Sequence, residues 1–289
     1  MLKLLSTAVA LSFILQSAAY NTAVEDFHKQ RALEIGGDSG WAALTDLQWL
    51  QNGQFTIGRA PSNAIRLNAP SSPERLGTLT VTPQAVTLQV APGVTAVVNG
   101  KASSEIQLPI NVAPVSAVSV GGIKCSVIER ADRRGLRVWD RVSPTRVSFR
   151  GLRWYPTSVR WRVDASFTPH QPAPMMRIQN IVGQTVEMAN PGVASFVVDG
   201  RTYRLEALLE SADATELFFM FRDGTSNKTT YGAGRYMYTA LPKDGHVTLD
   251  FNMAVNPPCA FTAFATCPLP PVKNRLLVPI DAGELDYRH

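Results

Sequence analysis

The sequence is poor in the residues and motifs from which enzyme active sites are most often built. Its 289 residues include only 3 cysteines and 4 histidines, and the charged fraction is 18%. Neither a Gly-x-Ser-x-Gly elbow nor a His-Glu-x-x-His motif occurs, and no Ser/His/Asp set is visible. The glycine-rich stretch at residues 232–235 lacks the Lys-Ser/Thr pair of a phosphate-binding loop. These absences disfavour the common hydrolase and nucleotide-binding classes.

The excess of basic over acidic residues is also small. The formal net charge is +5 at pH 7, and no basic run of five or six residues appears. The densest basic group is Arg133, Arg134 and Arg137, in one predicted hairpin. Binding of nucleic acid requires a concentrated basic face with aromatic side chains for base stacking. We therefore predict no nucleic-acid partner.

A long apolar run occurs only at the start of the chain. Residues 4–15 are predominantly apolar, Lys3 precedes them, and the small residues Ser17 and Ala19 stand at the spacing that a signal peptidase recognises. A membrane anchor is the alternative, but it needs roughly 20 apolar residues. We predict a signal peptide at residues 1–19, a periplasmic or secreted location, and no membrane span after cleavage.

Short stretches with alternating apolar and polar residues dominate the rest of the chain. From Gln54 onwards they recur between glycine, proline and asparagine residues, which is typical of antiparallel sandwiches and barrels. Before them, residues 24–33 have partly helical apolar spacing that ends at Gly36-Gly37. We therefore predict an all-β protein with one short N-terminal helix.

A break in the alternation divides the chain. The segment DRVSPTR interrupts the strands near residues 140–150. We predict that residues 20–145 form the helix and a first β-sandwich, and that residues 146–289 form a second antiparallel sandwich or barrel.

Residues 250–284 concentrate cysteine, proline and asparagine. Cys259 and Cys267 lie eight positions apart with prolines on their outer flanks, so a disulfide is the economical interpretation in an oxidising compartment. Closing so short a loop contributes about 2–3 kcal/mol in the chain-entropy model. Zinc is the alternative, but two further ligands are needed and His246 is the only histidine nearby. We predict no metal, and we predict that Cys125 is a small buried hydrophobic residue.

The prolines of this segment also predict its conformation. Proline fixes φ and removes a hydrogen-bond donor, so residues 256–258 and 268–271 are predicted to be extended, irregular arms rather than central strands.

Polar residues of the C-terminal half form the candidate site. The simplest expectation is structural, with Arg235 paired to Asp250 or Asn252 on a neighbouring strand and the asparagines capping backbone groups. Alternatively, these side chains converge at one end of the second β domain and bind a ligand. The ligand-binding candidates are Asp223, Tyr231, Arg235, Asp250, Asn252, Asn274 and Glu284.

Two functions follow from this set. Because no catalytic set is visible, the leading hypothesis is an exported, non-catalytic module that binds a small polar ligand or a cell-envelope partner, without a cofactor. The alternative is a hydrolase in which two carboxylates act on a sugar or an ester. Whether the protein is an enzyme is thus open, with a non-catalytic role preferred.

Residues 54–130 contain the four stretches QFTIGRAPSNAIRL, SSPERLGTLTV, TAVVNGKASSEIQL and VSAVSVGGIKCSVIER. Together these stretches resemble a forkhead-associated domain. The resemblance implies a small β-sandwich, and in that family an arginine, a serine, a histidine and an asparagine bind phosphothreonine peptides. The matching positions are Arg59, Ser71 or Ser72, and Asn99. The histidine is missing from residues 75–77, so we predict that this half does not bind phosphothreonine usefully.

A broader resemblance covers almost the whole mature chain. It rests on four stretches: GWAALTDLQWLQNGQFTIGRAPSN, GLRWYPTSVRWRVDASF, LFFMFRDGTSNKTTYGAGRYM and residues 250–284. Together these stretches are similar to the bacterial domain-of-unknown-function 1684 family. Val255 and Lys273 depart from its usual pattern, where an aromatic residue and an acid are common. The resemblance implies a folded module and no reaction.

Overall fold

The computed structural model describes residues 2–98, 101–130 and 132–287 and divides them into two compact units. We call residues 33–151 together with 261–267 the sandwich unit. Residues 2–32, 152–260 and 268–287 form the barrel unit. The chain therefore returns to the sandwich unit for one short segment before its C-terminal residues complete the barrel unit.

The sandwich unit consists of two sheets around one apolar core. Their strand orders are β1-β11-β10-β9-β6-β7 and β3-β2-β4-β5-β8, and β2 and β3 are the parallel neighbours in otherwise antiparallel sheets. The core contains Leu79 and Leu88 from one sheet and Val127 and Val138 from the other, all almost fully buried. The strands are β1 (Leu44–Leu50), β2 (Gly53–Gly58), β3 (Ile65–Arg66), β4 (Gly77–Val81), β5 (Val86–Val90), β6 (Ala96–Val98), β7 (Lys101–Ala102), β8 (Glu105–Gln107), β9 (Val118–Val120), β10 (Ile123–Arg130) and β11 (Arg133–Trp139), with short helical turns η1 (Trp41–Ala43), η2 (Pro114–Ser116) and α2 (Pro144–Ser148).

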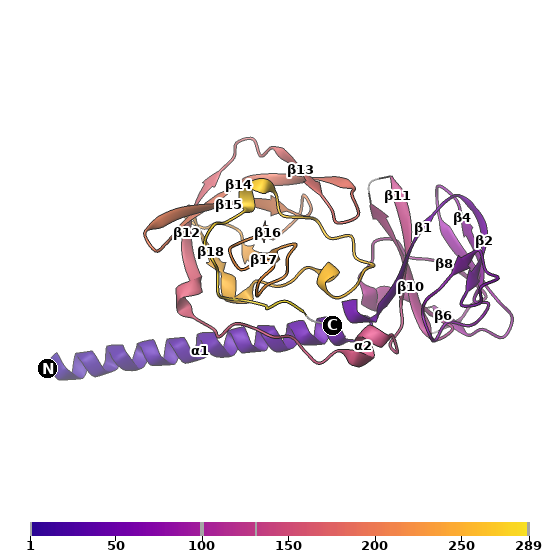
Figure 1. The fold of residues 1–289 in the computed structure, drawn as a ribbon, viewed down its shortest axis with the longest axis horizontal. Coiled ribbons are helices and arrows are strands. Elements are labelled where there is room, and N and C mark those ends of the chain that lie inside the picture. The colour runs from indigo at the N-terminus through magenta and orange to yellow at the C-terminus, as the bar shows by residue number, and fades with distance from the viewer. Residues whose placement is uncertain (1, 99–100, 131, 288–289) are drawn as a thin grey trace. The chain divides into compact units, whose positions relative to one another are not determined.

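The barrel unit is one strongly curved antiparallel sheet (Figure 1). The strand order is β17-β16-β15-β14-β12-β18, and β13 also pairs with β14. The two end strands approach each other, because the Thr239 hydroxyl on β17 donates to the Thr248 carbonyl on β18 at 2.9 Å, so the barrel is nearly closed. Its elements are β12 (Arg162–Pro169), β13 (Met175–Gln179), β14 (Thr185–Val198), β15 (Arg201–Leu209), β16 (Glu216–Phe221), β17 (Arg235–Ala240) and β18 (His246–Asp250), with turns η3 (Val159–Trp161), η4 (Phe251–Met253), η5 (Pro258–Ala260) and η6 (Val272–Asn274).

Aromatic side chains fill the interior of the barrel. Phe251 contacts the rings of Trp161, Phe196 and Phe221 at centroid distances of 5.4–6.2 Å. Burial of such rings, each contributing on the order of 1.5–3 kcal/mol, is the main stabilising term of this unit. The alternation seen in the sequence thus produces the predicted all-β class.

The N-terminal helix α1 (Leu2–Gly36) ends where the sequence predicted but is not short, since it spans 35 residues. Tyr20, Val24, His28 and Arg31 recur at intervals of three or four residues and therefore share one face of the helix. Val24 is fully buried, and the other three side chains bond to the barrel unit. This face attaches residues 20–32 to the barrel.

One further sequence prediction concerns the proline arms. Residues 256–258 and 268–271 lie outside the strands, as the prolines predicted.

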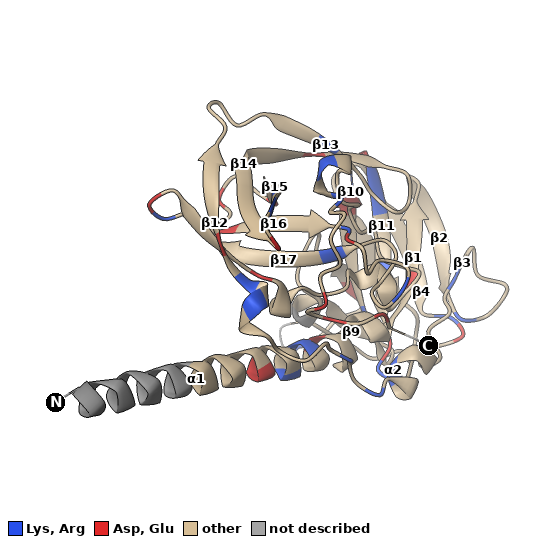
Figure 2. Cartoon of the chain, turned by 60° about the vertical axis from the view of Figure 1, so that its left-hand side comes forward, with Lys and Arg blue, Asp and Glu red and all other residues tan. Residues whose placement is uncertain are grey.

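Positive and negative residues are interspersed along the ribbon (Figure 2). Among the residues that the structure describes, no helix combines the length and hydropathy needed to cross a membrane.

Candidate functional site

Arg235 and Asp223 form a buried ion pair in the barrel unit. The Arg235 Nη2 to Asp223 Oδ2 distance is 2.5 Å, and the two side chains are 1% and 0% exposed. Arg235 also donates to the carbonyls of Ala282 and Ile280, and the Thr225 amide and hydroxyl donate to Asp223 Oδ1. With every charge satisfied, this pair is structural.

The partner that the sequence suggested for Arg235 was wrong. We expected Asp250 or Asn252, but β17 pairs with β16, and Arg235 lies opposite Phe221 in that register. Asp223, two residues beyond Phe221, is therefore within reach, whereas Asp250 ends a different strand, β18, which pairs with β12.

Glu284 lies fully buried near this pair. Its carboxylate accepts from the Asn256 amide at 3.1 Å and from Asn256 Nδ2 at 2.9 Å, and Arg31 Nε lies 3.9 Å away. Burial raises the pKa of Glu284 to about 7, while Arg31, Asn256 and Arg235 act in the opposite direction. Glu284 therefore joins α1, the proline arm and the C-terminal segment in one polar cluster.

Asp250 and Asn252 bind the N-terminal helix. Both oxygens of Asp250 accept from the Tyr20 hydroxyl at 2.9 Å, and Asn252 Nδ2 donates to the same hydroxyl at 2.8 Å. The Asn252 carbonyl contacts His28 Nε2 at 3.1 Å, and the His28 ring stacks on Trp154 at 3.6 Å. These residues are engaged in attaching α1 rather than in lining a cavity.

Tyr231 and Asn274 also have structural partners. The Tyr231 hydroxyl donates to the Cys259 carbonyl at 3.1 Å. Asn274 is fully buried; its Oδ1 accepts from the Glu206 amide, and its Nδ2 donates to the carbonyls of Glu206 and Met220. Asn274 thereby bridges β15 and β16, whose direct pairing is at Leu208 and Phe218.

The seven predicted residues therefore do not surround one open site. Asp223, Arg235 and Glu284 are near each other but buried, Asp250 and Asn252 share the Tyr20 hydroxyl, and Tyr231 and Asn274 occupy separate structural positions. An open polar groove lies elsewhere on the barrel unit.

A groove with a cavity of about 550 Å³ lies on the barrel beside Glu206. Glu206 Oε1 is 3.0 Å from Lys273 Nζ, and Oε2 lies 3.3 Å from His170 Nε2 and 2.7 Å from Asn190 Nδ2. Burial alone would raise the pKa of Glu206, but these hydrogen bonds outweigh it and hold the pKa below its usual value. Glu206 is therefore an anchored carboxylate. The groove is lined by Thr168, His170, Val193, Ser195, Arg204, Glu206 and Lys273.

A break in β14 builds this groove. The register of β14 against β15 shifts between Ala189 and Gly192, where Asn190-Pro191 interrupts the ladder. The Asn190 side chain accepts from the Gly192 amide and reaches across to Glu206, while the Pro191 carbonyl accepts from the His170 amide. Bulges of this kind redirect side chains next to functional sites.

Sequence reasoning missed the groove. His170 lies in a proline-rich connection and Glu206 lies within a strand, and neither residue was among the seven candidates. Two signals were present: an acid within the apolar second half of strand β15, and the Asn190-Pro191-Gly192 break within β14.

The forkhead-like positions of the sandwich unit are occupied by internal contacts. Arg59 lies 3.4 Å from Glu74, and the Ser71 hydroxyl donates to the buried Asp140 at 2.9 Å. Ser72 is buried and donates to the Pro73 carbonyl. Asn99 lies outside the described residues.

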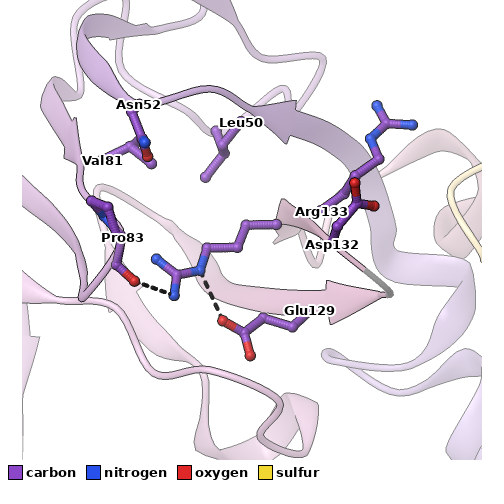
Figure 3. Close-up of a pocket in the computed structure, with 8 residues that line it drawn as sticks. Leu50, Asn52, Val81, Pro83, Glu129, Asp132 and Arg133 are labelled. Atoms are coloured by element: carbon purple, nitrogen blue, oxygen red, sulfur yellow. Dashed lines mark hydrogen bonds and ion pairs between the residues drawn. The ribbon is translucent and has the colours of Figure 1, made fainter.

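The sandwich unit has a cavity of about 380 Å³ near the tip of the β10–β11 hairpin (Figure 3). Arg134 lines it and donates to Glu129 at 2.8 Å and to the carbonyls of Thr82 and Pro83 at 2.7 Å. Arg133 stacks over Trp49 at 4.3 Å. Because its basic groups have these partners, this cavity is a weaker candidate than the Glu206 groove.

The described residues contain no disulfide, so the structure does not contain the predicted Cys259–Cys267 bond. Cys259 belongs to the barrel unit, whereas Cys267 ends the segment that packs with the sandwich unit. In that segment Phe261 is buried, and Phe264 packs against Leu44 and Trp139. Side-chain burial therefore holds this segment in the structure, and the disulfide stays a prediction.

Within residues 2–98, 101–130 and 132–287, no three His, Cys, Asp or Glu side chains are grouped so that they could hold an ion.

Together, the fold and the groove define a two-unit, all-β protein with an open polar groove on its barrel. Residues 147–285 match the model of a family described as "Protein of unknown function (DUF1684)", which places the C-terminal half of the chain in that family. Residues before 147 lie outside the match, so the broader resemblance is shown for this half only.

Solved structures similar to the chain include one from an archaeon. The solution NMR structure of an uncharacterized protein from Haloarcula marismortui is 35% identical, with a TM-score of 0.42, and the match covers 48% of this chain and 78% of that one. No curated protein matches the chain.

Proposed function

We propose that this chain is an exported, non-catalytic protein that binds a small polar ligand in the Glu206 groove of the barrel unit. The observation that carries the proposal is the lining of the groove. An anchored carboxylate, an imidazole and an ammonium group meet there in one cavity of about 550 Å³. This volume is within the range of roughly 300–1,000 Å³ that small-ligand sites occupy.

The lining indicates the chemistry of the ligand. Lys273 is 73% exposed and uses one of its three donors on Glu206, so it can also bind a ligand oxygen. Thr168 and Ser195 add hydroxyl groups, and Arg204 adds a second cation. Donors thus outnumber open acceptors, which suits a molecule rich in hydroxyl or carboxylate oxygens, such as a sugar or a sugar acid.

Ligand binding can be tested with neutral monosaccharides, disaccharides and uronic acids, measured by ligand-detected NMR and calorimetry on the full chain. We expect at least one of these sugars to bind and Lys273→Gln to weaken that binding roughly tenfold, the usual cost of losing a charged hydrogen bond. Lys243→Gln is the matched control, since Lys243 is exposed and lies outside the groove. Absence of binding, or equal affinity in the Lys273 and Lys243 variants, would contradict the proposal.

The hydrolase alternative has less support. Of the carboxylates that it invokes, Asp223 and Glu284 are fully buried, and Asp250 is 14% exposed and bonded to Tyr20. We expect no turnover of chromogenic glycosides and esters. Turnover by the wild type that Asp250→Asn or Glu206→Gln abolishes would favour the hydrolase instead.

Export rests on the signal-like sequence at residues 1–19. The contacts of α1 with the barrel that involve Tyr20, Val24, His28 and Arg31 all lie beyond Ala19, so cleavage there leaves them intact. N-terminal sequencing of the protein recovered from an exporting host should begin at Tyr20. Recovery of uncleaved chain from the cytoplasm alone would be evidence against export.

A further inference from the structure

A second cavity of the barrel unit combines three arginines with no acidic residue. Its volume is about 360 Å³, and the residues that line it are Arg177, Ile178, Gln179, Arg222, Ala233, Leu269, Pro270, Pro271, Val272 and Arg275. The Glu206 groove shares none of these residues. From these arginines we propose that the cavity is a binding site for the phosphate group of a small phosphate monoester.

The three arginines come from three segments that the backbone fixes in place. Arg177 lies on β13, Arg222 follows the end of β16, and Arg275 follows η6. Arg222 and Arg275 are partners in a parallel bridge, in which the Arg222 amide donates to Asn274 and the Arg222 carbonyl accepts from Leu276. The side chains of residues paired in a β-bridge project from the same face, so the Arg222 and Arg275 side chains leave the backbone next to each other.

The proline arm forms the wall between these segments. Pro268 bridges Asn180, and the Leu269 amide donates to the Gln179 carbonyl at 2.8 Å, which attaches the arm to the end of β13. Pro270 and Pro271 then line the cavity without adding amide donors. The wall is therefore apolar, and the polar chemistry of the cavity comes chiefly from the arginines and Gln179.

Gly234 allows the wall and Arg222 to approach. Its φ is +104°, and a Cβ there would lie 2.7 Å from Pro270 Cγ and 3.0 Å from Arg222 Cγ. A side chain at this position would therefore clash with both residues and with the Phe221 carbonyl oxygen, which would lie 2.5 Å from that Cβ, in addition to the strain of the left-handed backbone. The glycine fits a cavity whose shape is defined before a ligand arrives.

No carboxylate neutralises these arginines in the described part of the chain. None of the three forms an ion pair within 4.0 Å among the described residues. Glu187 is the cross-strand partner of Arg177, but no ion pair joins them. Asp223, which follows Arg222, is buried against Arg235.

Three uncompensated guanidinium groups favour a dianion over a single carboxylate, since each additional charge on the ligand adds to the attraction. The planar fork of arginine also matches phosphate oxygens in a bidentate geometry. The cavity volume of about 360 Å³ exceeds what one oxyanion fills and leaves room for a group of sugar size. A sugar phosphate therefore satisfies both the charge and the size of the cavity.

The test is calorimetric titration of the full chain, at constant low ionic strength, with glucose 6-phosphate, inorganic phosphate and glucose. We expect glucose 6-phosphate to bind more tightly than phosphate, and glucose not to compete for the same site. Arg222→Gln and Arg275→Gln should each weaken glucose 6-phosphate roughly tenfold or more. Arg201→Gln, which removes the same charge from an exposed position on β15, should leave the affinity unchanged.

Three outcomes would overturn the proposal: no binding of either phosphate compound, equal weakening by Arg201→Gln, or affinity unchanged by both cavity variants. A lipid headgroup offers the same phosphate chemistry, so vesicles of phosphatidylcholine with and without phosphatidic acid form a second arm. Binding to the phosphatidic acid vesicles without binding to glucose 6-phosphate would overturn the assignment to a soluble ester. Because Lys273→Gln leaves this cavity intact, failure of either proposed site can be distinguished from failure of the other.

Discussion

Arg235 and Asp223 lie twelve residues apart in sequence and form an ion pair inside the barrel unit, where water does not reach either side chain. The pair closes the turn between β16 and β17, and its arginine also holds the carbonyls of Ala282 and Ile280. The Arg235 guanidinium group thus links the C-terminal segment to the turn between β16 and β17.

Removing one member of this pair should be costly. Asp223→Asn leaves Arg235 buried without its counter-charge, and we expect the free energy of unfolding to fall by about 3–5 kcal/mol. Denaturant titration measures the change. Asp199→Asn is the control, because the exposed Arg160–Asp199 pair should contribute no more than about 1 kcal/mol. Similar losses of unfolding free energy in both variants would contradict the larger contribution expected of the buried pair.

Asn274→Ala should destabilise the barrel unit. The variant removes an amide that satisfies one backbone donor of Glu206 and two backbone acceptors, all in a buried position. Unsatisfied buried polar groups cost about 1–3 kcal/mol each, so we expect a loss of at least about 2 kcal/mol in chemical unfolding. The exposed Asn52→Ala should change stability by less than about 0.5 kcal/mol. Wild-type stability in the Asn274 variant would refute this role.

Glu284 should make stability depend on pH. Its pKa rises from an ordinary value of 4.5 to about 7 in the folded protein. Between these pH values the folded state retains a proton that the unfolded state has released. The free energy of unfolding therefore falls by on the order of 3 kcal/mol as the pH rises from about 4.5 to about 7.

The measurement is the difference in unfolding free energy between wild type and Glu284→Gln across this pH range. His28 has a lowered pKa and acts in the opposite direction, but it is common to both proteins and cancels in the difference. We expect the difference to change in favour of the variant as the pH rises. A difference that is constant with pH would contradict the raised pKa.

The sandwich unit should not bind phosphothreonine peptides at micromolar concentrations. Arg59 is engaged with Glu74, and Ser71 is engaged with Asp140. Fluorescence anisotropy with a phosphothreonine peptide library tests this directly. Micromolar binding that Arg59→Ala abolishes would show that the forkhead-like positions are functional after all.

The three cysteines should differ in reactivity. Burial raises the pKa of Cys125 to about 12, so this thiol should resist alkylation until the protein unfolds. If the predicted Cys259–Cys267 disulfide forms on export, the unfolded but unreduced protein should take up a single alkyl group, detected by intact mass. Uptake at all three cysteines without reductant would exclude the disulfide.

The sequence by itself determined the local structure of this protein. Alternation of apolar residues predicted the strands, Gly36-Gly37 predicted the end of α1, and proline predicted the irregular arms, because each signal acts on dihedral angles and faces within a few residues.

Only the tertiary structure decided which polar residues meet. The partner of Arg235 depends on β17 pairing with β16, and the groove brings together His170, Glu206 and Lys273 from distant parts of the sequence. Alternation has a period of two whichever strands are neighbours, so it specifies the face of each side chain but not the strand beside it. Burial of Glu284, like the assembly of the three arginines, arises from that choice of neighbours.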